Sequence, residues 1–131
     1  MSPPAAEFRF DQPDLLTALQ SLSDGELDAL PFGVIGFDEE TIVRQYNAHE
    51  SRGAGLSPDR VLGLPIFTAV APCMNNFMVA QRFEDAAAQG VALDAVLPYV
   101  LTLRMRPVSV QLRLVAAPGV GTRYVVVQWR P

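Results

Sequence analysis

The start of the chain carries leucines at helical spacing. Leu15, Leu19 and Leu22 recur at positions i, i+4 and i+7, which is the pattern of a helix with one buried face. A second short helix is predicted after it, because Ser23 and Glu26 have the Ser-x-x-Glu spacing in which each side chain satisfies a free amide at a helix start. The preceding residues are rich in proline and lack periodicity, so we expect an irregular arm there.

Later segments have the composition and patterning of β-strands. Residues 33–37 and 42–46 are short, largely apolar and flank an acidic turn, so they predict a β-hairpin. Residues 95–104, 108–116 and 123–129 are rich in Val, Leu and Tyr and are separated by turn-forming Pro and Gly. These features favour further strands in the last third of the chain.

The segment between these two groups of strands changes its pattern. Residues 51–55 have a turn-like sequence, and residues 57–61 offer a Ser cap followed by a Pro suited to the first position of a short helix. Residues 77–88 predict a longer helix that Gly90 ends. The order of elements predicts an α+β fold, with two N-terminal helices, about five antiparallel strands in one sheet, and helices crossing one face.

Composition excludes several classes of protein. With 131 residues, of which 50% are apolar and 18% charged, the chain suits one packed domain and is not a disordered polymer. The net charge is −4 and the arginines are scattered singly, so we expect no nucleic-acid partner. No apolar run approaches the roughly 18 residues needed to cross a bilayer, and the first residues lack the features of a signal peptide. We therefore expect no membrane partner and a cytoplasmic location.

Candidate chemistry lies in two places along the chain. Tyr46 and Glu50 are four positions apart, a spacing that suits a helical turn or a strand end running into one, so their side chains could converge on a single oxygen atom. Two protic donors at one point favour an anion. Cys73 is the only cysteine, and its thiol is suited to carry a covalent group. One cysteine and one histidine do not make a zinc site.

The tyrosine, the glutamate and the cysteine belong to two longer motifs. Residues 45–50 read Gln-Tyr-Asn-Ala-His-Glu and residues 70–73 read Val-Ala-Pro-Cys, and the cysteine follows the glutamate by 23 positions. In these motifs and their spacing the chain resembles the photoactive yellow protein family of PAS-fold blue-light receptors. The resemblance runs from about Leu27 to Trp129.

The resemblance implies both a domain organisation and a cofactor. Residues 1–30 would form the N-terminal cap on the far side of the sheet, and residues 31–131 the PAS core with the chromophore pocket. Cys73 would carry 4-hydroxycinnamic acid (p-coumaric acid) as a covalent thioester. Tyr46 and a protonated Glu50 would donate hydrogen bonds to its phenolate. We also count Phe67, Ala71, Pro72 and Met105 among the chromophore-binding positions, and of these Met105 matches the methionine that the family places against the chromophore.

Two positions depart from the family pattern. Ala54 stands where the family usually has a threonine bonded to the tyrosine, and Leu56 stands where it usually has an arginine over the phenolate. Arg52 lies close by in the sequence and is a candidate for that cover. We count all three among the chromophore-binding positions and expect the departures to affect tuning and kinetics.

The function that the resemblance implies is sensory rather than enzymatic. Light would convert the chromophore from trans to cis, and the phenolate would then take the proton of Glu50. The carboxylate left behind would be buried without its partner, and partial unfolding of the cap and of the loops around Glu50 would signal to an unknown downstream protein. We expect a monomer or a weak dimer.

Other interpretations of the same residues stay open at this point. Cys73 is also compatible with a structural role in a non-photochemical PAS module for dimerisation or small-ligand sensing. A cysteine enzyme using Cys73 with His49 is disfavoured, because the sequence offers no orienting partner for the sole histidine. His49 is expected at the surface or half-buried, with titration near neutrality as the functional alternative. Phe77 and Trp129 are expected to fill the core.

Overall fold

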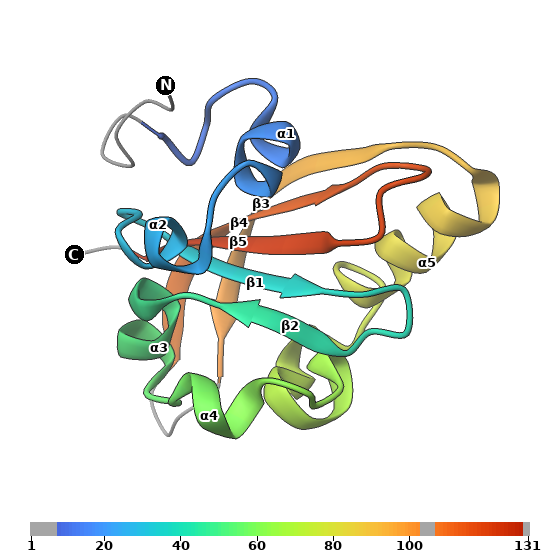
Figure 1. Ribbon diagram of the computed structural model, residues 1–131. Helices are drawn as coiled ribbons and strands as arrows, with labels where there is room; N and C mark the ends of the chain where they lie inside the picture. Colours follow the sequence, from blue (N-terminus) through green and yellow to red (C-terminus); the bar gives the residue numbers. More distant parts are fainter. Residues whose placement is uncertain (1–7, 103–106, 130–131) are drawn as a thin grey trace.

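The computed structural model describes residues 8–102 and 107–129 and contains a five-stranded antiparallel sheet (Figure 1). The strand order is β2-β1-β5-β4-β3, so β1 and β5 lie inside the sheet and β2 and β3 at its edges. The strands predicted from the sequence are confirmed within the described residues. β3 begins at Leu93, two residues earlier than expected, and the last two residues of its predicted range, 103 and 104, lie outside the described residues. The bounds are β1 (Gly33–Phe37), β2 (Val43–Tyr46), β3 (Leu93–Leu101), β4 (Val108–Ala116) and β5 (Arg123–Trp129).

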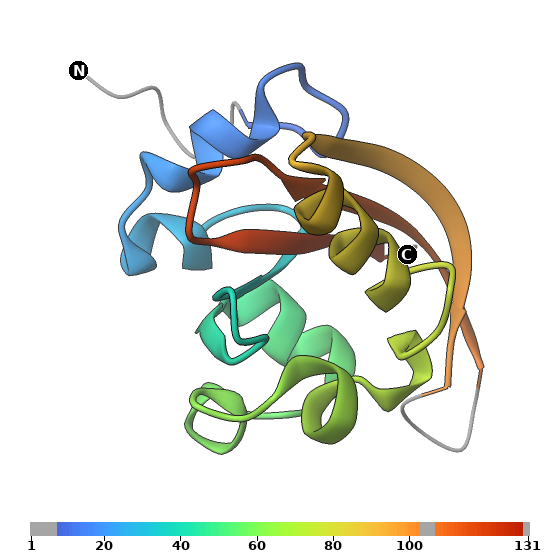
Figure 2. The same cartoon turned by 90° about the vertical axis from the view of Figure 1, so that its right-hand side faces the viewer.

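The sheet separates two hydrophobic clusters, because successive side chains of a strand point to opposite faces. Along β5, Val125 and Val127 belong to the cluster that also contains Phe83 of helix α5 (Ala80–Gln89). Tyr124 and Val126 belong to the other cluster, which contains the leucines of the N-terminal helices. Helix α5, at the right of Figure 1, faces the viewer in Figure 2. The predicted cap on the far side of the sheet is therefore confirmed for the residues that the structure describes, whereas the boundary at residue 30 stays a prediction.

The N-terminal helices are α1 (Leu15–Gln20) and α2 (Asp24–Asp28). The predicted capping box is present: the Glu26 N–H donates to the Ser23 hydroxyl at 3.2 Å, and the Ser23 N–H donates to the Glu26 carboxylate at 2.9 Å. Within the described ranges, no helix is both long and apolar enough to cross a membrane.

The irregular arm before α1 is tied to the sheet by one buried arginine. Arg113 of β4 is 5% exposed and makes a bidentate ion pair with Asp94 of β3, with both N–O distances at 2.8 Å. Its Nη1 also donates to the carbonyls of Phe10 at 2.9 Å and Gln12 at 2.6 Å. The arm is thus anchored through its backbone.

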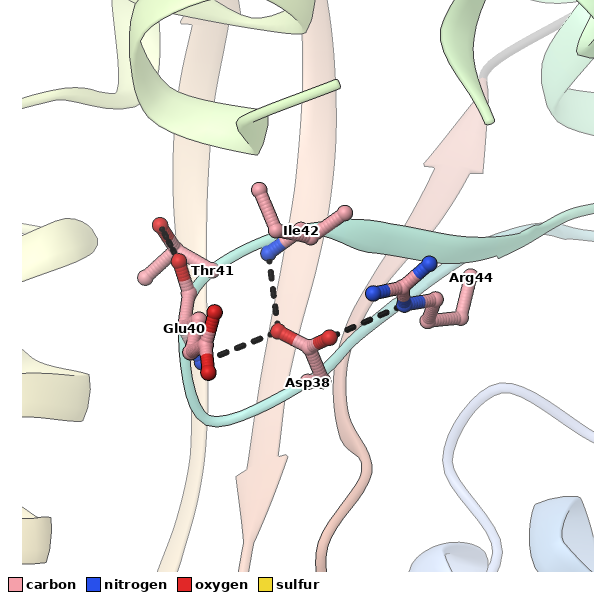
Figure 3. Close-up of polar contacts among 5 residues, drawn as sticks. All are labelled: Asp38, Glu40, Thr41, Ile42 and Arg44. Atoms are coloured by element: carbon pink, nitrogen blue, oxygen red, sulfur yellow. Dashed lines mark hydrogen bonds and ion pairs between the residues drawn. The ribbon is translucent and has the colours of Figure 1, made fainter. Parts of the chain in front are cut away.

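The turn between β1 and β2 is organised by Asp38 (Figure 3). One carboxylate oxygen accepts the N–H groups of Glu40 and Ile42 at 2.9 and 3.0 Å, and the other accepts from Arg44 Nε at 2.9 Å. These bonds, that from Ile42 first, hold the pKa of Asp38 below its usual value. They also stabilise Thr41 at its positive φ of 66°. The turn fixes the register of β2 and therefore the position at which that strand ends.

Short helices connect β2 to β3, and two predictions about them are wrong. Residues 51–55 are not a turn, because α3 runs from Ala48 to Ala54 and only Gly55, at φ 74°, ends it. The helix predicted over 77–88 begins at Ala80. Phe77 precedes it and is 79% exposed, so it is not part of the core. The remaining elements are α4 (Pro58–Val61), η2 (Ile66–Val70), η3 (Pro72–Met74) and α5 (Ala80–Gln89).

Candidate functional site

Tyr46 and Glu50 stand on either side of a strand-to-helix junction. β2 ends at Tyr46, Asn47 caps α3, and Glu50 lies in the first turn of that helix. Of the two local structures that their spacing allowed, the strand end running into a helix is the one observed. Both side chains are buried, Tyr46 at 6% and Glu50 at 1% exposure.

Asn47 fixes this junction and was given no role by the sequence analysis. Its Oδ1 accepts the N–H groups of Val34 at 2.9 Å and Glu50 at 3.1 Å. Its Nδ2 donates to the carbonyls of Leu27 at 2.8 Å and Phe32 at 3.0 Å. The 2% exposed amide therefore links α2, β1 and the helix that carries Glu50. Asparagine is a common helix cap, but only the fold shows the links to the other segments.

Glu50 is a neutral acid in this structure at pH 7. Burial raises the pKa of its carboxyl to about 8, and the hydrogen bond from Trp129 opposes that rise. Trp129 Nε1 donates to Glu50 Oε1 at 2.8 Å. Glu50 Oε2 is buried and has no hydrogen-bond partner among the described residues. A buried carboxyl oxygen without a partner has hydrogen-bonding capacity that the described residues leave unused.

The Tyr46 hydroxyl lies within electrostatic reach of Glu50. Burial is the main cause that raises the pKa of Tyr46 above its ordinary value, and the charge of an ionised Glu50 raises it further. The hydroxyl therefore keeps its proton at physiological pH and is available as a donor.

Cys73 lies in η3 and packs, half-buried, against the same hydrophobic cluster that contains Tyr46. Its backbone is held by two residues that the sequence analysis did not single out. The carbonyl of Cys73 accepts from the Tyr99 hydroxyl at 2.5 Å and from Asn76 Nδ2 at 3.3 Å. The same Asn76 amide also lies 2.6 Å from the Tyr99 oxygen. A side chain from β3 and one from the η3 to α5 loop thus fix the segment that carries the thiol.

The other predicted pocket positions divide by burial. Phe67, Ala71 and Ala54 are buried, and Leu56 is half-buried against the cluster that contains Tyr46. Pro72 is exposed. Met105 lies outside the described residues. These placements leave the assignment of each residue to a chromophore as a prediction.

Arg52 and His49 lie on the outer part of α3. Arg52 is exposed, whereas Leu56 packs, half-buried, against the cluster that contains Tyr46. His49 is half-buried, and burial first, followed by the charge of Arg52, lowers its pKa. His49 is therefore neutral at pH 7. Among the residues described here, no group of three or more His, Cys, Asp or Glu side chains is arranged to hold a metal ion.

Trp129 contributes more than the packing that the sequence predicted. It is half-buried against the cluster that contains Tyr46 and also forms the indole hydrogen bond to Glu50. The only sequence signal for this role was that an indole N–H in a core needs an acceptor, and the acceptor is 79 positions away.

The fold is that of a PAS domain. The PAS domain of an HTR-like protein from Haloarcula marismortui superimposes with a TM-score of 0.58 over 88% of this chain and 99% of that domain, at 14% identity. This likeness concerns the fold alone. No family model matches the chain.

Closer relatives define the family. The chain is 34% identical over 106 residues to the photoactive yellow protein of Rhodothalassium salexigens, covering 81% of this chain and 84% of that protein. The photoactive yellow protein domain of the sensor histidine kinase Ppr from Rhodospirillum centenum is 37% identical and superimposes with a TM-score of 0.78, covering 86% of this chain and 97% of that domain. The chain belongs to the photoactive yellow protein family.

Proposed function

We propose that this PAS photoreceptor carries a 4-hydroxycinnamoyl group as a thioester on Cys73 and holds its phenolate with Tyr46 and Glu50. The observation that carries the proposal is the Glu50 carboxyl, 1% exposed, with a pKa of about 8 and with Oε2 buried and unpartnered among the described residues. A phenolate oxygen is the acceptor that such a donor lacks. The protonated Tyr46 hydroxyl adds a second donor. Cys73 packs against the hydrophobic cluster that contains Tyr46. The donor set thus fits an anionic group.

When bound, this group would supply a double bond that light converts from trans to cis and a phenolate able to accept a proton. Glu50 gives that proton from Oε2 and becomes a buried carboxylate. The rise of its pKa from 4.5 to about 8 corresponds to about 5 kcal/mol favouring the neutral form. A domain of this size is stable by about 5 to 15 kcal/mol. One buried charge is therefore enough to loosen part of the structure.

The first turn of α3 connects this charge to the cap. The Asn47 amide donates to the Leu27 carbonyl, and the Ala48 N–H donates to the Asp28 carboxylate at 2.8 Å. Both acceptors belong to α2. Movement of Glu50 disturbs these bonds, so the cap loosens and exposes a surface. That surface would be recognised by a downstream signalling protein.

Reconstitution with an activated ester of 4-hydroxycinnamic acid tests the proposal. We expect the full chain to gain one covalent group and a blue absorption band that bleaches in blue light and recovers in darkness. Both should be lost in Cys73→Ala, while Met74→Ala, a change of the next residue in the same turn, should keep the covalent group. Wild-type protein without a band, or Cys73→Ala with an unchanged band, would refute the proposal and favour a PAS module in which Cys73 is structural.

A further inference from the structure

Close packing holds the Glu50 carboxyl against the indole of Trp129. Gly33 lies so close that a Cβ atom at this position would meet Glu50 Oε1 at 2.1 Å. Gly53 of α3 lies so close to Trp129 that a Cβ atom there would meet the indole Cε2 at 2.5 Å. The absence of side chains at these two positions makes room for the pair. The hydrogen bond of 2.8 Å therefore sits in a site built around it.

The two oxygens of Glu50 have different environments. A neutral carboxyl has a carbonyl oxygen, which accepts, and a hydroxyl oxygen, which donates. An indole N–H is a donor only, so it pairs best with the carbonyl oxygen. Because Trp129 donates to Oε1, the acidic proton belongs on Oε2. Oε2 is the oxygen left without a partner among the described residues.

We propose that Trp129 is a positioning residue that selects Oε2 of Glu50 as the proton-donating oxygen and then stabilises the carboxylate that remains. The O–H bond at Oε2 breaks, the proton passes to the phenolate oxygen, and the bonding electron pair stays on Glu50. Trp129 changes neither its covalent structure nor its charge. The photochemical part of this inference rests on the function proposed above, whereas the selection of the oxygen rests on the protein alone.

The expected effect has a definite sign. A hydrogen bond to a carboxylate is stronger than one to a neutral acid, so the indole favours the charged form of Glu50. Removing the donor should raise the proton affinity of Glu50 by about tenfold, or about one pH unit. Glu50 then becomes a poorer proton donor to the phenolate.

The titratable side chains near Glu50 do not account for the expected shift of its pKa. Tyr46 on β2 keeps its proton at physiological pH, and His49 on α3 is neutral there, with Arg52 as the charge that acts on it. These side chains remain in place when Trp129 is changed.

Nuclear magnetic resonance of the full chain without chromophore tests the inference. Trp129 is the sole tryptophan, so the chain gives one indole N–H resonance. We expect this resonance to shift with pH at the midpoint of the carbon-13 titration of the Glu50 carboxyl, and to stop titrating in Glu50→Gln. Trp129→Phe should move the Glu50 midpoint up by about one pH unit. Tyr124→Phe is the matched control, because it removes a hydroxyl from the same strand on the opposite face and should leave the midpoint unchanged.

The outcomes separate the two proposals. If the chemical shift of the indole N–H in wild-type protein does not change as Glu50 titrates, the inference is overturned, even if Trp129→Phe fails to fold. A Glu50 midpoint that is unchanged in a folded Trp129→Phe protein also overturns it. In the loaded chain, Trp129→Phe should keep its covalent group and blue band but retain more of the Glu50 proton in the light. Failure of wild-type protein to bind the chromophore would refute the proposed function, whereas the assignment of the Glu50 proton to Oε2 would still stand.

Discussion

The burial of Glu50 makes the stability of the chromophore-free chain depend on pH in a direction opposite to that of an ordinary carboxylate. The pKa of Glu50 is raised in the folded state to about 8 from 4.5. Below pH 4.5 both states hold the proton, and Glu50 contributes no pH dependence. Between these values the unfolded chain releases the proton and the folded chain keeps it, so stability falls as the pH rises.

The size of the effect follows from the same two values. The slope is about 1.4 kcal/mol per pH unit, so the Glu50 contribution reaches about 5 kcal/mol near pH 8 and then levels off. Glu50→Gln has no proton to release at this position. The free energy of unfolding of the variant minus that of wild type should therefore grow by about 5 kcal/mol between pH 4.5 and pH 8.

Urea unfolding of both chains at half-unit pH intervals measures this difference. Titration of the other groups cancels, since both chains share them, and a constant offset from the buried amide of the variant does not change with pH. Glu39→Gln serves as a control, because Glu39 is exposed in the turn between β1 and β2. A difference for Glu50→Gln that stays flat across this range would refute the assignment of Glu50 as a buried neutral acid.

Further substitutions test the neighbouring contacts. Asn47→Ala removes the four hydrogen bonds of the amide, of which the one to Leu27 reaches the cap, and should lower the free energy of unfolding by about 2 to 4 kcal/mol in urea. A loss below about 0.5 kcal/mol would contradict the role of that amide as the junction. Gly53→Ala should displace the Trp129 indole and shift its N–H resonance. An unchanged resonance would contradict the close packing of Gly53 against the indole. Arg52→Ala in the loaded chain should leave the pH at which the blue band bleaches unchanged at low and high salt, since Arg52 is exposed; a rise that is larger at low salt would make this arginine the cover.

The sheet and the N-terminal helices were predictable because their signals are local. The apolar and Val-, Leu- and Tyr-rich runs of the strands and the Ser23 to Glu26 spacing are features of neighbouring residues, and the structure contains the strands and the capping box that they predict. The start of α5 was predicted wrongly because the Asn76 side chain accepts the N–H groups of Met78 and Val79, which places a turn where an apolar run suggested helix. Phe77 is exposed as a result.

The site was predictable in its residue types and not in its contacts. Tyr46, Glu50 and Cys73 could be singled out from spacing and resemblance, and the first two lie within electrostatic reach of each other. The bond from Trp129 to Glu50 joins residues 79 positions apart and depends on how β5 pairs with β1. No local pattern encodes such a contact.

Infrared spectroscopy of the loaded chain, recorded as the difference between light and dark, tests the central claim most directly. The claim is that Glu50 is protonated in the dark and gives up this proton in the light. Wild-type protein should lose the carbonyl band of a protonated carboxyl upon illumination and gain carboxylate bands, and Glu50→Gln, with its absorption moved to the red, should show neither change. Complete bleaching of the blue band in wild-type protein while the protonated carboxyl band persists would contradict the account.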